Sequence, residues 1–440
     1  VDGSAVTLGR CGGTVALASG ATQTGFGRTG TVNWITTKKT TGFTAVSGEG
    51  YFCDTAASGA FTLTLPSSPS AGNIVGLKDY NGNFATANLT IGRGGSPING
   101  GSAIDVVIST AGASIFLVYV DATQGWVATQ DDSSTFSGVA FLEATGGTIT
   151  TSGNCKIHTF TGPGTFAVSQ ISSTAPENVV SYMVVAGGAS GGVAEGGGGG
   201  GAGGFRELKS PITPYTASPL DGYPSAPNRI TVTAASFPIT VGAGGAQNPG
   251  GPPAGNPGAN SVFSTITSTG GGPGARFREA NDPQAAGGSG GGGTGRRTPG
   301  CGPNPGGNGN TPPVSPPQGN PGGAANTPSP TSSNDAGGGG GGATAAGTDS
   351  GYNTGQPGGA GATTNITASP VAYGGGGGGG SQASTGGSGG AGGGGAGFSG
   401  SSGGATGTAN TGGGGGGAGA GPTAGQAGGS GIVVIRYKFQ

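Results

Sequence analysis

The side chains that most often carry acid–base or nucleophilic chemistry are rare in this sequence. Its 440 residues include one histidine, His158, which lies in the alternating stretch 155–160 typical of a β-strand. Every serine of a Ser-His-Asp arrangement would have to share this one imidazole. We therefore interpret His158 as a packed or surface residue and predict that the protein is not an enzyme.

Motifs for cofactors and metals are equally weak. Residues 197–204 match G-x-G-x-x-G, as any glycine tract does, but no helix or ribose-binding acid follows in a βαβ context. Asp131 and Asp132 are adjacent, and neighbouring side chains of an extended chain point in opposite directions. We predict no catalytic residue, no cofactor and no metal site.

The four cysteines are too far apart to form a recognisable motif. Cys11, Cys53, Cys155 and Cys301 include no C-x-x-C pair, and their density is low for a disulfide framework. We expect free and mostly buried thiols, since unpaired cysteine behaves as a small apolar residue. This fits assembly in a reducing cytoplasm.

The composition excludes several classes of partner. Glycine accounts for 111 residues and proline for 30, whereas charged residues make up 8% and the formal net charge is −1. Nucleic-acid binding needs a basic surface, which this balance does not supply. No stretch of about 20 apolar residues occurs, so we predict no insertion into a membrane.

Glycine is distributed unevenly along the chain, which indicates at least two parts. The first 140 residues contain 23 glycines and the remaining 300 contain 88. The first part shows short alternating or apolar runs between Gly, Asn and Pro turn signals, a pattern that predicts an all-β unit. These runs are 61–65, 73–78, 88–91, 114–120 and 125–127.

Residues 40–129 resemble a small β-domain that recurs in bacteriophage tail fibres. The resemblance rests on 59–66, 68–72, 79–91, 98–100 and 117–126, in this order and at this spacing. It implies a trimeric fibre shaft, which the residues alone do not; the alternative is a generic β-sandwich. We accordingly predict a β-rich tail-fibre domain at 40–137, preceded at 1–39 by the end of a shaft or connector.

The remaining chain alternates strand-like pieces with glycine runs. The expected strands are 155–160, 164–169, 179–185, 229–233, 238–241, 261–267 and 431–437. Residues 182–188, 239–245 and 428–437, with the glycine runs between them, resemble the glycine-rich domains of phage tail tips. We therefore predict a glycine-rich, receptor-binding tip domain at 138–440. The insertions at 208–228 and 298–335 are less like that family.

The glycine runs are expected to be ordered as packed polyproline-II helices. Such a helix has three residues per turn, rises about 3.1 Å per residue and makes no internal hydrogen bond, so its N–H and C=O groups point outward. Polyglycine helices can approach closely and bond to neighbours on every side; at that rise, run 196–204 spans roughly 28 Å. The flanking strands must supply an apolar core, which predicts a β-sandwich-like domain. The alternative is that the runs are flexible linkers.

Recognition is expected at loops that interrupt the glycine scaffold, because loops on rigid scaffolds carry binding residues. Aromatic and arginine side chains dominate binding hot spots, and they are scarce in this half of the chain. Each of them is a candidate either for receptor contact or for a structural plug, with 276–278 as the first choice. The candidates are Arg276, Phe277, Arg278, Arg296, Arg297, Tyr215, Tyr223, Tyr352, Tyr373 and Phe398.

These observations favour a distal tail-fibre protein that attaches a virion to a bacterial surface receptor. The expected partners are a cell-surface glycan, lipopolysaccharide or outer-membrane protein and other fibre subunits, in a homotrimer. The expected location is the extracellular virion, after assembly in the host cytoplasm. One alternative is a self-assembling structural fibre or surface-layer protein without a receptor. Another, disfavoured by the irregular insertions, is an ice-binding polyproline-II bundle.

Overall fold

The protein divides into two compact units, residues 1–139 and 140–440, which are described separately. As predicted, the fold is all-β; the described helical elements are the short 3-10 turns η1 (Ala175–Asn178) and η2 (Ala226–Asn228). No helix in the described part of the chain is long and apolar enough to span a bilayer. The computed structural model describes residues 32–101, 105–129, 141–193, 195–247, 255–275, 285–295, 304–325, 334–421 and 424–439.

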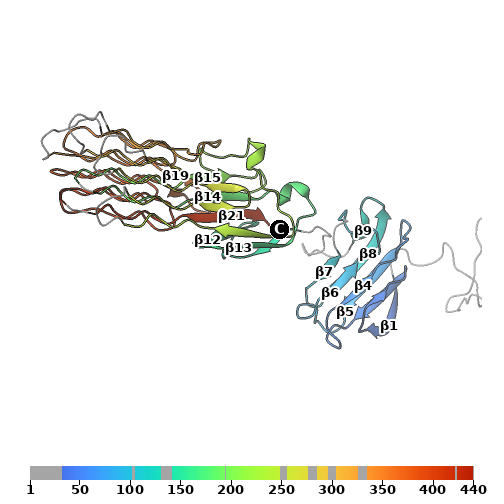
Figure 1. Ribbon diagram of the computed structural model, residues 1–440. Helices are drawn as coiled ribbons and strands as arrows, with labels where there is room; N and C mark the ends of the chain where they lie inside the picture. The colour runs from blue at the N-terminus through green and yellow to red at the C-terminus, as the bar shows by residue number, and fades with distance from the viewer. Residues whose placement is uncertain are drawn as a thin grey trace, which may run out of the picture. The chain divides into compact units, whose positions relative to one another are not determined.

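The first unit consists of two sheets, and its strands β1 to β6 belong to them in alternation (Figure 1). One sheet has the order β1-β3-β5-β8-β9 and the other β2-β4-β6-β7. Strands β1, β3 and β5 are parallel, as are β2, β4 and β6, because each connection passes through a strand of the opposite sheet. The strands are β1 (Asn33–Lys39), β2 (Phe43–Thr44), β3 (Glu49–Cys53), β4 (Phe61–Thr64), β5 (Ile74–Asp79), β6 (Leu89–Gly92), β7 (Val106–Ile108), β8 (Ser114–Asp121) and β9 (Gly125–Ala128).

The core of this unit lies between the two sheets. Leu77, Phe84 and Trp126 are fully buried there, together with the thiol of Cys53. Strand β1 pairs with β3, so the unit includes residues that the sequence placed in a connector at 1–39. The residue pattern of 33–39 did not predict this strand, because β1 is an edge strand that is largely exposed.

The second unit contains a sandwich of two five-stranded sheets, ordered β10-β13-β16-β17-β18 and β11-β12-β21-β14-β15. Their apolar faces enclose Phe166, Tyr182, Phe263 and Tyr437. A two-stranded sheet, β19-β20, completes the unit. The strands are β10 (Glu143–Thr145), β11 (Thr148–Ser152), β12 (Cys155–Phe160), β13 (Gly164–Gln170), β14 (Ser181–Val185), β15 (Phe205–Leu208), β16 (Ser236–Thr240), β17 (Ser261–Phe263), β18 (Ile266–Ser268), β19 (Ala362–Thr364), β20 (Val371–Tyr373) and β21 (Ile432–Lys438).

Strand β21 is the central strand of its sheet, pairing antiparallel with β12 on one side and β14 on the other. The opposite face of this sheet is covered by a second apolar cluster that includes Phe205, Ile366 and Tyr373. Burial on both faces explains why the sequences of β14 and β21 are almost continuously apolar.

Two strand predictions were wrong. Residues 229–233 form no strand; Ile230 and Val232 are buried in the sandwich, and the backbone makes one isolated bridge, Val179 with Thr231. Residues 261–267 are not one strand but the hairpin β17-β18, which reverses at Ser264 with a φ of 52°. Tight turns at positive φ usually carry glycine or asparagine, and the serine at this position therefore did not indicate a turn.

The glycine runs form an ordered lattice of extended segments, as predicted. In run 196–204 every residue donates a backbone hydrogen bond to another segment. Residues 197, 200 and 203 donate to 418, 415 and 412; residues 198, 201 and 204 donate to 275, 272 and 269; residues 199 and 202 donate to 338 and 341. The partner segment changes with a period of three, which is the repeat of a polyproline-II helix.

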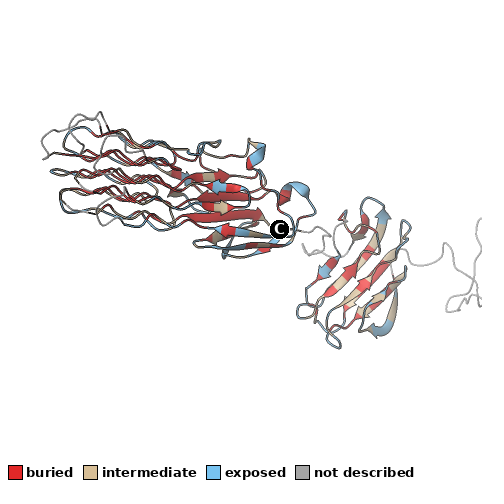
Figure 2. Cartoon of the chain, in the orientation of Figure 1, coloured by how far each residue is buried: buried red, intermediate tan, exposed pale blue. Residues whose placement is uncertain are grey.

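Run 196–204 is surrounded by six segments of the same chain. Besides the three that accept its N–H groups, segments 186–192, 289–295 and 377–380 donate to its carbonyls. The backbone groups that a glycine run exposes are therefore paired inside the bundle, which removes the cost of burying them. Figure 2 shows burial continuing from the sheets into these segments.

Glycine is required here by contact rather than by conformation. A Cβ at Gly198 would lie 1.9 Å from the carbonyl oxygen of Gly292, and one at Gly203 would lie 2.0 Å from that of Ala186. These separations are far below any van der Waals contact, so the lattice has no room for a side chain at these positions. The alternation of strands and glycine runs thus produces a sandwich that continues into a bundle.

Candidate functional site

The excursions between glycine runs gather at the end of the bundle remote from the sheets. Segment 186–192 continues β14, and segment 196–204 leads back into β15, so the turn between them lies at the far end (Figure 1). We call the group of such excursions the loop end, and its described members are 193, 195–196, 334–336, 350–354, 381–385, 398–403 and 419–421.

Backbone contacts hold these excursions together. Gly196 donates to the carbonyl of Gly419 at 3.0 Å, and Ala420 donates to that of Gly400 at 2.7 Å. Gln382 donates to the carbonyl of Asp335 at 2.8 Å. The loop end is therefore one continuous surface assembled from segments far apart in the sequence.

Serine side chains complete the hydrogen bonding where the glycine runs end. The Ser350 hydroxyl donates to the carbonyl of Ala336, and the Ser381 hydroxyl donates to that of Asn353, both at 2.7 Å. The Ser399 hydroxyl accepts the N–H of Gly386 at 2.8 Å. Such side-chain bonds replace the lattice bonds that stop at a turn, and they give the loops a fixed base.

Two of the predicted aromatic candidates lie at the loop end. Tyr352 is 55% exposed and stands beside Asn353, whose φ is 80°. Phe398 is half-buried, and a Cβ at Gly404 would lie 2.0 Å from its ring. Tyr352 is therefore presented to solvent, whereas Phe398 closes the bundle against a glycine.

Three other candidates lie near the sheets instead. Tyr373 is 5% exposed and packs in the apolar cluster under β21. Tyr215 lies 5.3 Å from the guanidinium of Arg436, and Tyr223 lies 4.4 Å from that of Arg229. Burial raises the pKa of Tyr215 and of Tyr373 above the usual tyrosine range. All three side chains fit the plug role that the sequence left open.

The arginine-containing candidates Arg276, Phe277, Arg278, Arg296 and Arg297 fall outside the described residues.

Three segments of the described loop end are neutral and rich in hydroxyl groups, whereas its other described members include the half-buried Glu195 and the buried Asp335. Segments 350–354, 381–385 and 398–403 contain serine, threonine, asparagine, glutamine, one tyrosine and one phenylalanine, and no charged residue. These side chains can donate and accept hydrogen bonds and offer an aromatic face. They suit a polyhydroxylated ligand better than an ionic one.

The sequence did not identify the serines at 350, 381 and 399. Ser381 directly follows the glycine run 374–380, and that position was a signal that could have found it; Ser350 and Ser399 adjoin no such run.

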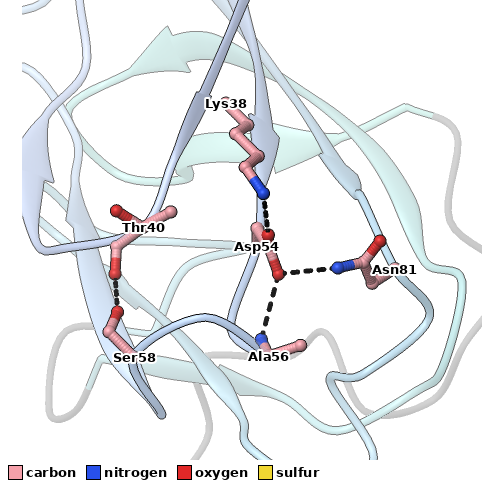
Figure 3. A network of polar contacts seen from close by, with 6 residues as sticks. All are labelled: Lys38, Thr40, Asp54, Ala56, Ser58 and Asn81. Atoms are coloured by element: carbon pink, nitrogen blue, oxygen red, sulfur yellow. Dashed lines mark hydrogen bonds and ion pairs between the residues drawn. The ribbon is translucent and has the colours of Figure 1, made fainter.

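The polar groups of the first unit form a structural network at the ends of β1, β3 and β5 (Figure 3). The Asp54 carboxylate, 1% exposed, accepts bonds from Lys38 Nζ at 2.7 Å, Asn81 Nδ2 at 3.0 Å and Ala56 N at 3.1 Å. Ser58 donates to the carbonyl of Thr40 nearby. The hydrogen bond from Lys38 lowers the pKa of Asp54. The network fixes three turns and leaves no carboxylate oxygen directed at solvent.

His158 has a packing role consistent with the sequence interpretation. It is fully buried; Nδ1 lies 2.7 Å from the Gly146 carbonyl oxygen, and Nε2 lies 3.2 Å from the Tyr437 hydroxyl. The ring stacks on Tyr437 and meets Phe166 edge-on. Burial lowers the pKa of this imidazole.

The cysteine prediction is confirmed for two residues, since Cys53 and Cys155 are buried free thiols. Burial raises the pKa of Cys53 to about 12, which suppresses its reactivity. Cys11 and Cys301 lie outside the described residues. In the described part of the chain, no three His, Cys, Asp or Glu side chains are grouped as metal ligands.

Comparison with known proteins supports the description of the second unit. A family model described as "Glycine-rich domain" matches residues 160–438, which is more than half of the chain and spans the sandwich strands from Phe160 through β21 together with the bundle. No curated protein matches the sequence.

Proposed function

The chain belongs to the glycine-rich domain family, and on that premise we propose that it attaches a particle to a cell surface through its loop end. The supporting observation is that every described excursion from the far end of the glycine runs joins one hydrogen-bonded surface. A rigid scaffold that gathers otherwise unrelated loops at one end is the arrangement used for recognition.

The bundle suits this role because its loops can vary without changing its core. Lattice contacts are made by backbone groups of the glycine runs, and the loops contribute only local caps such as those of Ser350 and Ser381. A change at an exposed position of 350–354 or 381–385, such as Tyr352, therefore alters the surface and leaves the scaffold intact. Receptor-binding proteins that must follow a changing target need this separation.

The target that we propose is a bacterial surface glycan or lipopolysaccharide, with an outer-membrane protein as the other receptor class. The neutral hydroxyl and amide groups and Tyr352 match sugar hydroxyls and apolar sugar faces. The arginines at 276, 278, 296 and 297, which fall outside the described residues, are the candidates in the sequence for binding anionic groups.

We further propose that the particle is a bacteriophage and that the chain is the distal, trimeric part of its tail fibre. The first unit supports this context through its resemblance to a fibre β-domain, now seen as a coil of parallel strands around one core. The second unit would then be the tip, located outside the cell on the assembled virion.

The test is binding of the fluorescently labelled full chain to a panel of bacterial strains. Wild type is expected to bind at least one strain, and Tyr352→Ala is expected to bind it about tenfold more weakly, the loss of one aromatic hot-spot residue. Tyr80→Ala is the matched control, because Tyr80 is 51% exposed but belongs to the first unit. The triple variant Arg276→Ala, Phe277→Ala, Arg278→Ala tests the first-choice loop.

Binding to no strain would overturn the proposal and favour the self-assembling fibre. Equal weakening by Tyr80→Ala and Tyr352→Ala would show that recognition does not reside at the loop end.

A further inference from the structure

The perimeter of the bundle is uneven in the backbone groups that it offers to a neighbour. In segment 355–361, two residues of every three donate their N–H groups to adjoining segments. The remaining residue of each three is Pro357, which has no N–H group, or Ala360, whose N–H has no acceptor among the described residues. One residue in three thus directs its donor away from the bundle, and here proline removes half of these donors.

The same arrangement recurs along this side of the perimeter. Pro321 precedes Ala324 by three residues, and the N–H of Ala324 is taken by the Asp349 carboxylate at 2.7 Å. Pro257 and Pro305 occupy equivalent places in segments 255–260 and 304–309. We call the region formed by segments 255–260, 304–309, 320–325 and 355–361 the proline side. Its prolines and the Asp349 carboxylate hinder pairing with another chain, as prolines and charges do at the edge strands of sheets.

The rest of the perimeter lacks these devices. Segments 386–391, 394–398, 404–408, 425–431 and 242–246 follow one another around it, joined by bonds such as Ala405 N to Ala396 O and Gly428 N to Gly245 O, both 2.9 Å. These segments contain no proline and no Asp, Glu, Lys or Arg. We call this region the open side.

Unused backbone groups are present on the open side. The N–H and C=O groups of both Gly389 and Thr406 have no partner among the described residues. Thr406 is exposed, so its groups are accessible. The lattice could continue from this side, because its outermost segments retain the donors and acceptors that join segments inside the bundle.

We propose that the open side binds the open side of a second copy of this chain, in a two-fold contact that is separate from the three-fold assembly of the fibre proposed above. Two observations favour a copy over another partner. The lattice accepts either chain direction, since run 196–204 pairs antiparallel with 412–418 and parallel with 338–341, so a two-fold-related copy can be accommodated. The open side is also free of charge, so two identical faces meet without repulsion.

The test uses the purified full chain with the photoreactive residue p-benzoylphenylalanine in place of Thr406 or, as a matched control, of Ala360. Both positions are exposed, and both have a backbone N–H without a partner in the described part of the chain. Irradiation is expected to give a covalent dimer from position 406 and none from position 360. Dimer from both positions, or from neither, overturns the proposal.

A second measurement does not depend on correct folding of the protein that carries the photoreactive residue. Thr406→Lys places like charges across the contact and is expected to weaken self-association at least about tenfold in sedimentation equilibrium, whereas Ala360→Lys leaves it unchanged. Unchanged association of a folded Thr406→Lys protein contradicts the proposal. No cell is involved, so failure here is independent of the receptor-binding test.

Discussion

Replacing one central glycine of the lattice by alanine is expected to destabilise the second unit strongly. A Cβ at Gly200 would lie 2.3 Å from the carbonyl oxygen of Ala189 and 2.7 Å from that of Ser190. Neither atom belongs to a flexible side chain, so the backbone of segment 186–192 must withdraw. A withdrawal of about 1 Å takes a backbone bond beyond hydrogen-bonding range.

The magnitude follows from the bonds between these two segments. Segment 186–192 donates to run 196–204 at three places, with N···O distances of 2.8 to 3.0 Å. A net loss of about 1 kcal/mol for each of three bonds, with the further cost of overpacking at about 1–3 kcal/mol, gives a decrease in the free energy of unfolding of about 4–6 kcal/mol.

The matched control is Gly351→Ala. A Cβ at Gly351 meets nothing within 4 Å, and its φ is not in the left-handed region. Alanine is expected to be neutral there or to stabilise by about 0.4–1 kcal/mol through the unfolded chain.

The assay is urea unfolding followed by circular dichroism, with tryptophan fluorescence as an internal reference. Both tryptophans, Trp34 and Trp126, lie in the first unit, so their transition should not move in either variant. A Gly200→Ala protein as stable as wild type, or two variants with equal effects, would refute the close-packing argument.

Three further changes have expected outcomes. The pKa of His158 is lowered by burial, so its contribution is fully present above the unfolded value of about 6.5 and lost as pH falls below it, at up to about 1.4 kcal/mol per pH unit; His158→Phe should flatten this slope in acid unfolding curves. Arg436→Met leaves the carbonyls of Ile366 and Pro214 without their donor and should cost about 3–5 kcal/mol, measured by thermal unfolding with faster proteolysis of 209–228. Asp54→Ala should lower the tryptophan-monitored midpoint of the first unit and leave the second unit unchanged.

The sequence predicts the all-β class and the bundle for physical reasons that are local. Apolar runs such as 181–185 and 432–438 indicate strands because burial on both faces requires them. The glycine runs indicate polyproline-II packing because nothing else can pair so many bare backbone groups. The parallel coil of the first unit was not predictable, since alternation within a strand does not reveal which sheet the strand joins.

The perimeter of the bundle does carry a sequence signal of its own. Asn320-Pro-Gly-Gly-Ala324 and Gln356-Pro-Gly-Gly-Ala360 place proline and alanine three residues apart. In a helix with three residues per turn these side chains share one face. Because most positions that face a neighbouring segment have no room for a Cβ atom, this spacing is typical of segments at the perimeter.

The sequence offers aromatic loop residues as candidates for recognition, but it does not indicate where in the fold each of them lies. Tyr215, Tyr223 and Tyr373 lie near the sheets, and Tyr352 lies at the loop end. The separation depends on which end of a glycine run each loop joins. That in turn depends on pairing between segments more than two hundred residues apart, which the sequence pattern does not specify.

The central claim is that the glycine runs are a hydrogen-bonded lattice that holds the loop end in place. Amide hydrogen exchange of the full chain, resolved by residue, tests it most directly. We expect strong protection throughout 196–204 and, in 355–361, protection of every N–H except that of Ala360. Uniformly fast exchange in these runs, as in a flexible glycine linker, would contradict it.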